Sequence, residues 1–352
     1  MRYCTSLSEL RRTDEPRFGA KSANLGELLA AGIPVPPGFA LSAQAFTAFI
    51  DESGLGGRIA LAIGDPAAGD ADRIGAVSHA ISESMRSAPV PDSLRAEIAS
   101  HYAELALASG VQSPPVAVRS SAVGEDGQDA TFAGLQESYL WVRGTEHVCD
   151  AVRDCWVSLY SPPAISYRAR LARGSDAPAM GVTVQLMVDA EVSGVMFTCN
   201  PVSGDPSMVA INASWGLGLA VVGGEVTPDD YLVSKVTREV VREHISCKQV
   251  EYVPDAAGRG AVRLAIPPPR RNVRCLSEHE LRTLIEVAVH VERHFGSHQD
   301  IEWAFARRPQ PAERLFIVQS RPVSALPQCH KPQPADALSM VMATFGAGRR
   351  EA

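Results

Sequence analysis

Two segments in the last sixth of the chain carry side chains that suit a metal and a phosphate. The segments QDIEWAF, which begins at Gln299, and LFIVQSRP both alternate polar and apolar residues. If they are paired strands, Asp300 and Glu302 share one face, and Gln319 and Arg321 share a face of the neighbouring strand. Carboxylate and amide oxygens suit a hard divalent cation, and a guanidinium suits a phosphate oxygen. The alternative is a half-buried hairpin with a solvated polar face.

Two basic residues in the first half of the chain are candidates for binding phosphate. Lys21 follows Gly19 in the first turn of an expected helix, where free backbone N–H groups and the helix dipole favour an anion. Arg119 leaves the end of an apolar strand and enters a turn of small residues, a position that suits phosphate binding. For each residue, the alternative is an ordinary surface cation.

Three further segments have the composition of ligand-binding loops or strand ends. A short hydroxyl-bearing loop, able to close over phosphates, contains Thr131, Phe132, Ala133 and Gly134. The end of a strand, where backbone groups can bind an adenine edge, contains Gln185, Leu186, Met187 and Val188. The glycine-dense residues 215–229 form either a tight-turn element or a substrate-facing loop. A hairpin turn and an ordinary core strand are the alternatives for the first two segments.

The composition describes a globular protein that can bury a large core. The 352 residues are 45% hydrophobic and 21% charged, and this length suggests about two or three domains or subdomains. The net charge of −7 argues against a general nucleic-acid or membrane surface. The seven cysteines show no CxxC spacing, which indicates neither a zinc site nor a disulfide framework. Without a long apolar segment, the chain is expected to be cytoplasmic, with no nucleic-acid or membrane partner.

Local patterns predict a helical beginning followed by a strand-rich region. Helices are expected over residues 22–31, 42–53, 91–109 and 146–171, whereas residues 54–72 are expected to form a loop. Strands are expected over residues 116–118, 138–142, 181–188, 192–198, 208–213 and 231–235. Ser277 and Glu280 form a capping-box pattern before a helix that ends near Gly296. We expect lobes at residues 1–184 and 185–325, and a tail or linker at 326–352.

Taken in order, the motifs resemble a known family. The chain resembles the N-terminal ATP-grasp domain of phosphoenolpyruvate synthase and pyruvate phosphate dikinase, a domain type that rifampin phosphotransferase shares. The matching segments are GAKSANLGEL, GIPVPPGF, VAVRSSAVGED, TFAGLQES, VSGVMFTCNP, WGLG with VTPDDYLV, DIEWAF and LFIVQSRP. The resemblance implies an α+β, two-lobed ATP-grasp fold with mixed or antiparallel sheets and flanking helices.

The resemblance also implies a reaction and a role for each candidate residue. Family members bind Mg²⁺-ATP between the lobes and pass its β-phosphoryl group to a histidine on a swivelling domain, giving AMP and phosphate. By residue match, the phosphate-covering loop is residues 131–134 and the adenine-side linker is residues 185–188. The phosphate-binding and catalytic matches are Lys21, Arg119, Asp300 and Arg321. The metal ligands implied are Glu302 and Gln319, with Glu302 also in the catalytic set.

The sequence departs from the family pattern at two places. Leu219 stands where these synthases usually have a glutamate after Trp-Gly-Leu-Gly, and the Gly-Gly-x-Thr-Ser-His motif of the phosphohistidine domain does not occur. We therefore expect a histidine-bearing partner domain or subunit, as in the multi-subunit phenylphosphate synthases, with onward transfer to phenol or a pyruvate-like acceptor. The alternatives are a non-catalytic nucleotide-sensing module and a stand-alone ATP-grasp kinase or ligase.

Overall fold

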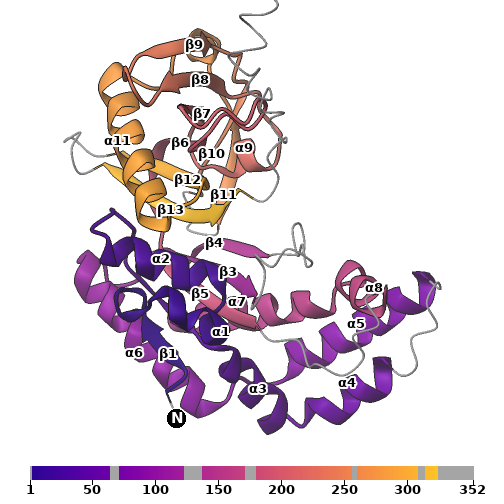
Figure 1. Cartoon of the computed structure of the whole chain (residues 1–352). Coiled ribbons are helices and arrows are strands. Elements are labelled where there is room, and N and C mark those ends of the chain that lie inside the picture. Colours follow the sequence, from indigo (N-terminus) through magenta and orange to yellow (C-terminus); the bar gives the residue numbers. More distant parts are fainter. Residues whose placement is uncertain are drawn as a thin grey trace, which may run out of the picture.

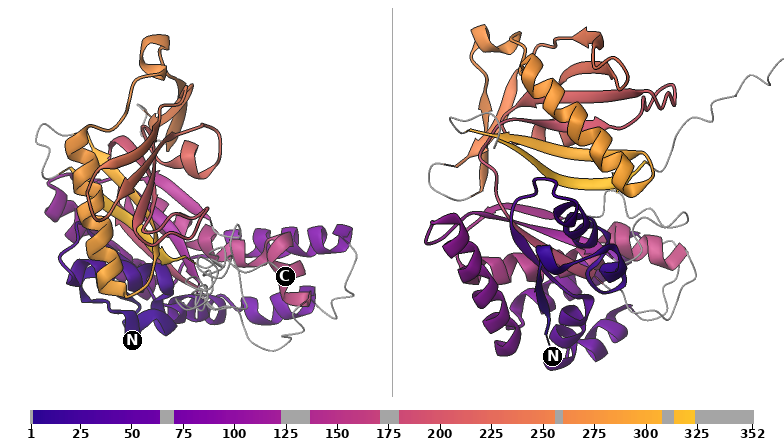
Figure 2. Two further views of the ribbon diagram at one scale, coloured as in Figure 1. Left: turned by 45° about the horizontal axis from the view of Figure 1, so that its top comes forward. Right: turned by 60° about the vertical axis from the view of Figure 1, so that its left-hand side comes forward.

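The chain forms two lobes, each built on its own antiparallel sheet. The computed structural model describes residues 2–63, 71–122, 137–170, 180–255, 260–307 and 314–323. One lobe lies above the other in Figure 1, and Figure 2 shows them from two further directions. The predicted α+β class, with two lobes, antiparallel sheets and flanking helices, is confirmed. In the described ranges, no helix combines the length and apolar character needed to cross a bilayer.

The sheet of the first lobe has five strands in the order β1-β2-β5-β3-β4. Each strand is antiparallel to its neighbours. Val182 and Val184 belong to a core made with helices between residues 43 and 157, whereas Thr183 lies on the opposite face, where its Oγ1 is 2.6 Å from Ser22 Oγ. The strands are β1 Cys4–Ser6, β2 Gly38–Leu41, β3 Val116–Ala122, β4 Ser138–Val142 and β5 Met180–Leu186.

The helices of the first lobe largely follow the predicted pattern. Trp156 is fully buried in their core and stacks on Phe49 with ring centroids 5.3 Å apart. The expected loop over residues 54–72 is wrong in part, because residues 55–63 form α4. Leu55 and Ile59, four residues apart, bury one face of this glycine-containing helix in the core, which offsets its poor intrinsic propensity. The α-helices are α1 Glu15–Phe18, α2 Ala20–Ala30, α3 Ala43–Glu52, α4 Leu55–Ile63, α5 Ala71–Ser87, α6 Asp92–Ser109, α7 Thr145–Val157 and α8 Pro162–Arg170. The 3-10 turns are η1 Leu7–Glu9, η2 Arg12–Asp14 and η3 Ser158–Tyr160.

The second lobe is a six-stranded sheet in the order β13-β12-β6-β7-β8-β9, with α11 across one face (Figure 1). The capping box that the sequence predicts is present: the Glu280 N–H donates to Ser277 Oγ at 3.2 Å, and the Ser277 N–H donates to the Glu280 carboxylate at 2.8 Å. The helix ends at Gly296 as predicted. The strands of this sheet are β6 Ala190–Phe197, β7 Met208–Trp215, β8 Asp229–Ser234, β9 Val240–His244, β12 Gln299–Ala306 and β13 Leu315–Pro322. Two further strands, β10 Val250–Pro254 and β11 Ala261–Ala265, pair in a separate antiparallel sheet. The helices are α9 Leu219–Val222, α10 Pro268–Arg271 and α11 Glu278–Phe295.

Two connections join the lobes. The chain crosses from β5 to β6 through residues 187–189, and helix α2 packs against the second lobe. Leu25 and Leu28 of α2 share one buried apolar cluster with Ile285 of α11 and Ile317 of β13. Because this cluster contains residues of both lobes, α2 forms a fixed contact between them on one side of the molecule.

Replacing Gly19 with alanine should destabilise the protein more than the same change at Gly32. Both glycines have positive φ angles, +78° and +74°. A Cβ at Gly19 would lie 2.1 Å from the carbonyl oxygen of Ser121, whereas a Cβ at Gly32 meets nothing within 4 Å. We expect a loss of about 3 kcal/mol at Gly19, where backbone strain and a steric clash add, and about 1 kcal/mol at Gly32. Denaturant unfolding of the two variants measures the difference, and equal losses would contradict it.

Candidate nucleotide and metal site

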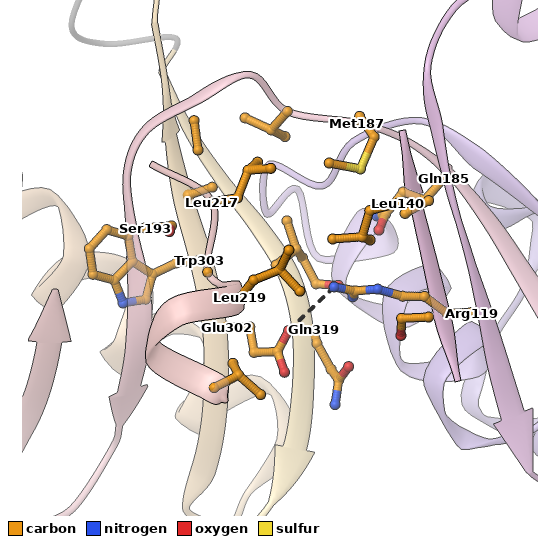
Figure 3. A pocket seen from close by; sticks show the side chains of 18 of the residues that line it. Arg119, Leu140, Gln185, Met187, Ser193, Leu217, Leu219, Glu302, Trp303 and Gln319 are labelled. Carbon is orange, nitrogen blue, oxygen red and sulfur yellow. Dashed lines mark hydrogen bonds and ion pairs between the residues drawn. The ribbon is translucent and has the colours of Figure 1, made fainter. Parts of the chain in front are cut away.

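Strands β12 and β13 place the polar residues of the two C-terminal motifs opposite one another. In the antiparallel register, Asp300 pairs with Arg321 and Glu302 pairs with Gln319. The side chains of Glu302 and Gln319 both point to the space between the lobes in Figure 3. The alternation of the two sequences thus produces the shared face on which the predicted metal site depends.

Arg119 extends from β3 of the first lobe to this strand pair. Its Nη1 donates to the carbonyl oxygen of Val318 at 3.1 Å, where a β-bulge makes Val318 the extra residue of β13. Its Nη2 lies 3.5 Å from Glu302 Oε2, at the outer limit of a hydrogen bond (dashed line in Figure 3). The Arg119 Nε is buried and has no hydrogen-bond partner among the residues that the structure describes. The guanidinium therefore retains donor capacity beside the carboxylate.

Lys21 lies at the start of α2, close to the strand that carries Arg119. Its Nζ donates to the carbonyl oxygen of Ser120 at 3.1 Å. Gly19, which precedes the helix, packs so closely on Ser121 that the first turn of α2 rests against the end of β3. Lys21 thus contacts the backbone of the residue that follows Arg119, 99 positions away in sequence.

A cavity of about 370 Å³ between the lobes collects most of the predicted site residues. Its wall comes from β3, β4 and β5 of the first lobe and from β6, β12, β13 and the segment around α9 of the second. The predicted residues that line it are Lys21, Arg119, Gln185, Leu186, Met187, Val188, Glu302, Gln319 and Arg321. The charged groups and the apolar linker thus line the same cavity.

One end of this cavity is apolar. Leu140, Met187 and Leu217 surround it, and Leu219 lies between them and Glu302 (Figure 3). The polar groups of the linker are partly engaged within the protein: Gln185 Nε2 donates to the Pro36 carbonyl oxygen at 3.2 Å, and the Met187 N–H donates to that of Pro115 at 2.9 Å. The apolar side chains are therefore the main surface that this end offers to a flat ring.

Asp300 does not line the cavity but binds a residue that does. Its Oδ2 accepts from Arg321 Nε at 2.9 Å and lies 2.8 Å from Arg321 Nη2. Burial raises the pKa of Asp300 above its usual range, and the charge of Arg321 opposes this shift. The carboxylate thus holds the guanidinium of Arg321 in place beside Gln319.

The cavity contains residues that the sequence did not single out. Leu140, Ser193, Val222 and Trp303 line it without having been candidates. Trp303 directly follows Glu302, so its position in the motif could have identified it as a site residue. Leu140 lies in a short strand, and nothing in its sequence context indicates a site. These residues form parts of the cavity wall between the candidate groups.

The glycine-dense segment 215–229 was expected to form either a tight-turn element or a substrate-facing loop, and its two ends differ in this respect. Leu217, Gly218 and Leu219 line the cavity, so this part faces the site. Asp229, in contrast, is fully buried in the second lobe and pairs with Lys248. The predicted phosphate-covering residues Thr131, Phe132, Ala133 and Gly134 lie outside the described residues, as does the segment 326–352.

The donor set of the cavity fits a magnesium nucleotide. Glu302 and Gln319 offer hard oxygen ligands, and the cationic groups of Lys21, Arg119 and Arg321 suit phosphate oxygens. Within the described ranges, no group of three or more His, Cys, Asp and Glu side chains is arranged to hold a metal ion. A metal here would thus have few protein ligands, which is usual for Mg²⁺ bound together with phosphates and water.

Comparisons with known proteins find one family over most of the chain. Residues 15–341 match the family described as pyruvate phosphate dikinase, AMP/ATP-binding domain. A probable phosphoenolpyruvate synthase of Methanocaldococcus jannaschii is 37% identical over 335 residues, covering 95% of this chain and 28% of that protein. The phosphoenolpyruvate synthase of Aeropyrum pernix is 37% identical over 340 residues, covering 90% of this chain and 42% of that protein. The chain thus spans less than half the length of these relatives.

A solved structure is also similar over most of its length. A crystal structure of a protein from Pyrococcus horikoshii OT3 covers 90% of this chain and 97% of its own, with 12% identity and a TM-score of 0.36. This superposition is too distant to inform the site.

Proposed function

Because the chain belongs to the pyruvate phosphate dikinase AMP/ATP-binding domain family, we propose that it binds Mg²⁺-ATP between its lobes and donates a phosphoryl group to a histidine on a separate swivelling domain or subunit. The observation that carries this proposal is the cavity between the lobes. It combines an apolar end with the charged groups of Lys21, Arg119, Glu302 and Arg321.

Each wall of the cavity has a role in this proposal. The adenine ring packs at the apolar end against Leu140, Met187 and Leu217. Lys21 and Arg119 of the first lobe bind the phosphate oxygens. Arg321 binds phosphate, Glu302 and Gln319 hold the metal, and Asp300 orients Arg321. Bound Mg²⁺ would supply positive charge that neutralises the phosphate oxygens during transfer.

The proposed reaction needs positioning and charge neutralisation rather than a nucleophile from this chain. A histidine nitrogen of the partner attacks the β-phosphorus of ATP, the bond to the AMP oxygen breaks, and water cleaves the γ-phosphate from the β-phosphate to give free phosphate. Among the described residues that line the cavity there is neither a histidine nor a cysteine. This composition favours an acceptor that enters from outside. Onward transfer from phosphohistidine would reach phenol or a pyruvate-like acceptor.

The isolated chain should bind Mg²⁺-ATP but form little AMP until a polypeptide with the phosphohistidine domain is added. With that polypeptide and ATP labelled with ³²P at the β-phosphorus, label should appear on the partner. The adduct should be labile in acid and stable in base, as phosphohistidine is. Thin-layer chromatography of the nucleotides and autoradiography of the proteins measure both products.

Three other results would each replace the proposal with a different one. Rapid AMP formation with phosphorylation of a small molecule by this chain alone would indicate a stand-alone kinase. Label from the γ-phosphorus retained on the partner, with ADP released, would exclude β-phosphoryl chemistry. Nucleotide binding without turnover in the presence of the partner would indicate a nucleotide-sensing module.

A further inference from the structure

Asn24 lies where the helix that carries Lys21 meets the strand that carries Gln319 and Arg321. It is the third residue after Lys21 in α2, and only 8% of it is exposed. Its Nδ2 donates to the backbone carbonyl oxygen of Ser320 at 3.2 Å, across 296 positions of sequence. Ser320 lies between the two candidate residues of β13. This hydrogen bond therefore joins helix α2, which carries Lys21, to strand β13, which carries Gln319 and Arg321.

The same helix is also fixed to the first lobe. Ser22 Oγ and Thr183 Oγ1 of β5 are 2.6 Å apart, and the Ser22 N–H donates to Ser121 Oγ of β3 at 3.3 Å. Ser22 and Thr183 are both fully buried. Helix α2 is therefore held by polar contacts to both sheets within one and a half turns of Lys21.

The residue whose carbonyl oxygen Asn24 binds is itself held by a buried polar network through its side chain. Ser320 Oγ donates to Gln299 Oε1 at 2.9 Å, and Gln299 is fully buried. The Gln299 N–H donates to Thr198 Oγ1 at 2.9 Å, and its Nε2 donates to Ser297 Oγ at 3.0 Å. These bonds join β13, β12 and the end of β6. They hold Ser320 in a defined position, in which its carbonyl oxygen accepts the hydrogen bond from Asn24.

From these contacts we infer that Asn24 is a positioning residue for the polyphosphate. Its bond to Ser320 sets the spacing between Lys21 in α2 and the Gln319 and Arg321 side chains of β13. Asn24 itself does not line the cavity, so it acts through those residues. The inference rests on the proposed function, because it concerns the binding of Mg²⁺-ATP at this site. Phosphoryl transfer depends on such spacing, since small displacements of charged groups reduce it strongly.

Asn24→Ala and Asn24→Asp should weaken Mg²⁺-ATP binding selectively. Alanine removes the donor, and aspartate keeps the shape but places a carboxylate against the Ser320 carbonyl. We expect about a tenfold loss of affinity for Mg²⁺-ATP, the size expected for one buried hydrogen bond. The affinity for metal-free AMP, which lacks the β- and γ-phosphates, should change less than about twofold. Isothermal titration calorimetry measures both affinities, and thermal unfolding verifies that the variants are folded.

His294→Ala is the matched control. His294 Nε2 lies 2.9 Å from Glu27 Oε1, so the pair also joins α2 to the second lobe, but it does not line the cavity. Loss of this bond should leave both affinities unchanged.

The outcomes separate this inference from the proposed function. Unchanged Mg²⁺-ATP affinity in a folded Asn24 variant, or equal weakening of AMP and Mg²⁺-ATP, would overturn the positioning role. If the alanine variant does not fold, the isosteric aspartate variant gives the same comparison. Failure of the unsubstituted protein to bind Mg²⁺-ATP would instead overturn the proposed function.

Discussion

Glu302→Ala should reduce Mg²⁺-dependent phosphoryl transfer by about 10²–10³-fold, the loss typical for removal of a group that stabilises transition-state charge. Glu302 is proposed to hold the metal beside Gln319 at the centre of the cavity. Its side chain is 24% exposed, and its recorded side-chain partner is Arg119 at 3.5 Å. Because it lies on the face of a strand and not in the apolar core, the variant should keep its fold.

The measurement is a magnesium titration of AMP formation with the histidine-bearing partner, together with thermal unfolding by circular dichroism. Glu243→Ala provides a matched control. Glu243 lies on β9 of the same lobe and pairs with Arg274 at 3.0 Å, but it does not line the cavity between the lobes. Wild-type turnover by a folded Glu302→Ala protein would reject Glu302 as a metal ligand, whereas equal losses in both variants would point to a general effect on the lobe.

Lys248→Met should destabilise the second lobe by about 3–5 kcal/mol, because it leaves the charge of Asp229 buried without a counterion. Lys248 and Asp229 form an ion pair in which both side chains are completely inaccessible to solvent. Asp229 also accepts from the N–H groups of Ser246 at 3.0 Å and Cys275 at 3.1 Å, and from Cys275 Sγ at 2.9 Å. Burial and the neighbouring carboxylate raise the pKa of the Cys275 thiol, which keeps it protonated as a donor.

A neighbouring ion pair allows a direct comparison. Arg242 and Asp230 are 2.9 Å apart, with side chains 62% and 33% exposed, so Arg242→Met should change stability by at most about 1 kcal/mol. Urea unfolding monitored by fluorescence measures both variants. The double variant Asp229→Leu/Lys248→Met should recover part of the loss, because no buried charge is left unpaired but the N–H groups of Ser246 and Cys275 lose their acceptor. A loss at Lys248 no larger than that at Arg242 would contradict this account of the buried pair.

The sequence by itself determined the elements whose pattern is local. The alternation in residues 299–305 and 315–322 predicted two strands with shared polar faces, and the structure pairs Glu302 with Gln319. Ser277 and Glu280 predicted the start of α11. Such features depend on groups within a few positions of one another, so the sequence contains nearly all the information for them. Helix α4 was not predicted, because the burial of Leu55 and Ile59 stabilises it and its local composition does not.

Only the tertiary structure decided which residues share the cavity. Arg119 and Glu302 are 183 positions apart, and their contact depends on how the two lobes pack around α2. The same packing brings Leu140 to the apolar end of the cavity, where nothing in its sequence neighbourhood indicated a site. Packing within the second lobe buries Asp229 with Lys248, although the surrounding glycines were equally compatible with a substrate-facing loop. The physical reason is that burial and long-range contacts depend on the summed packing of both lobes, whereas periodicity and capping depend on near neighbours alone.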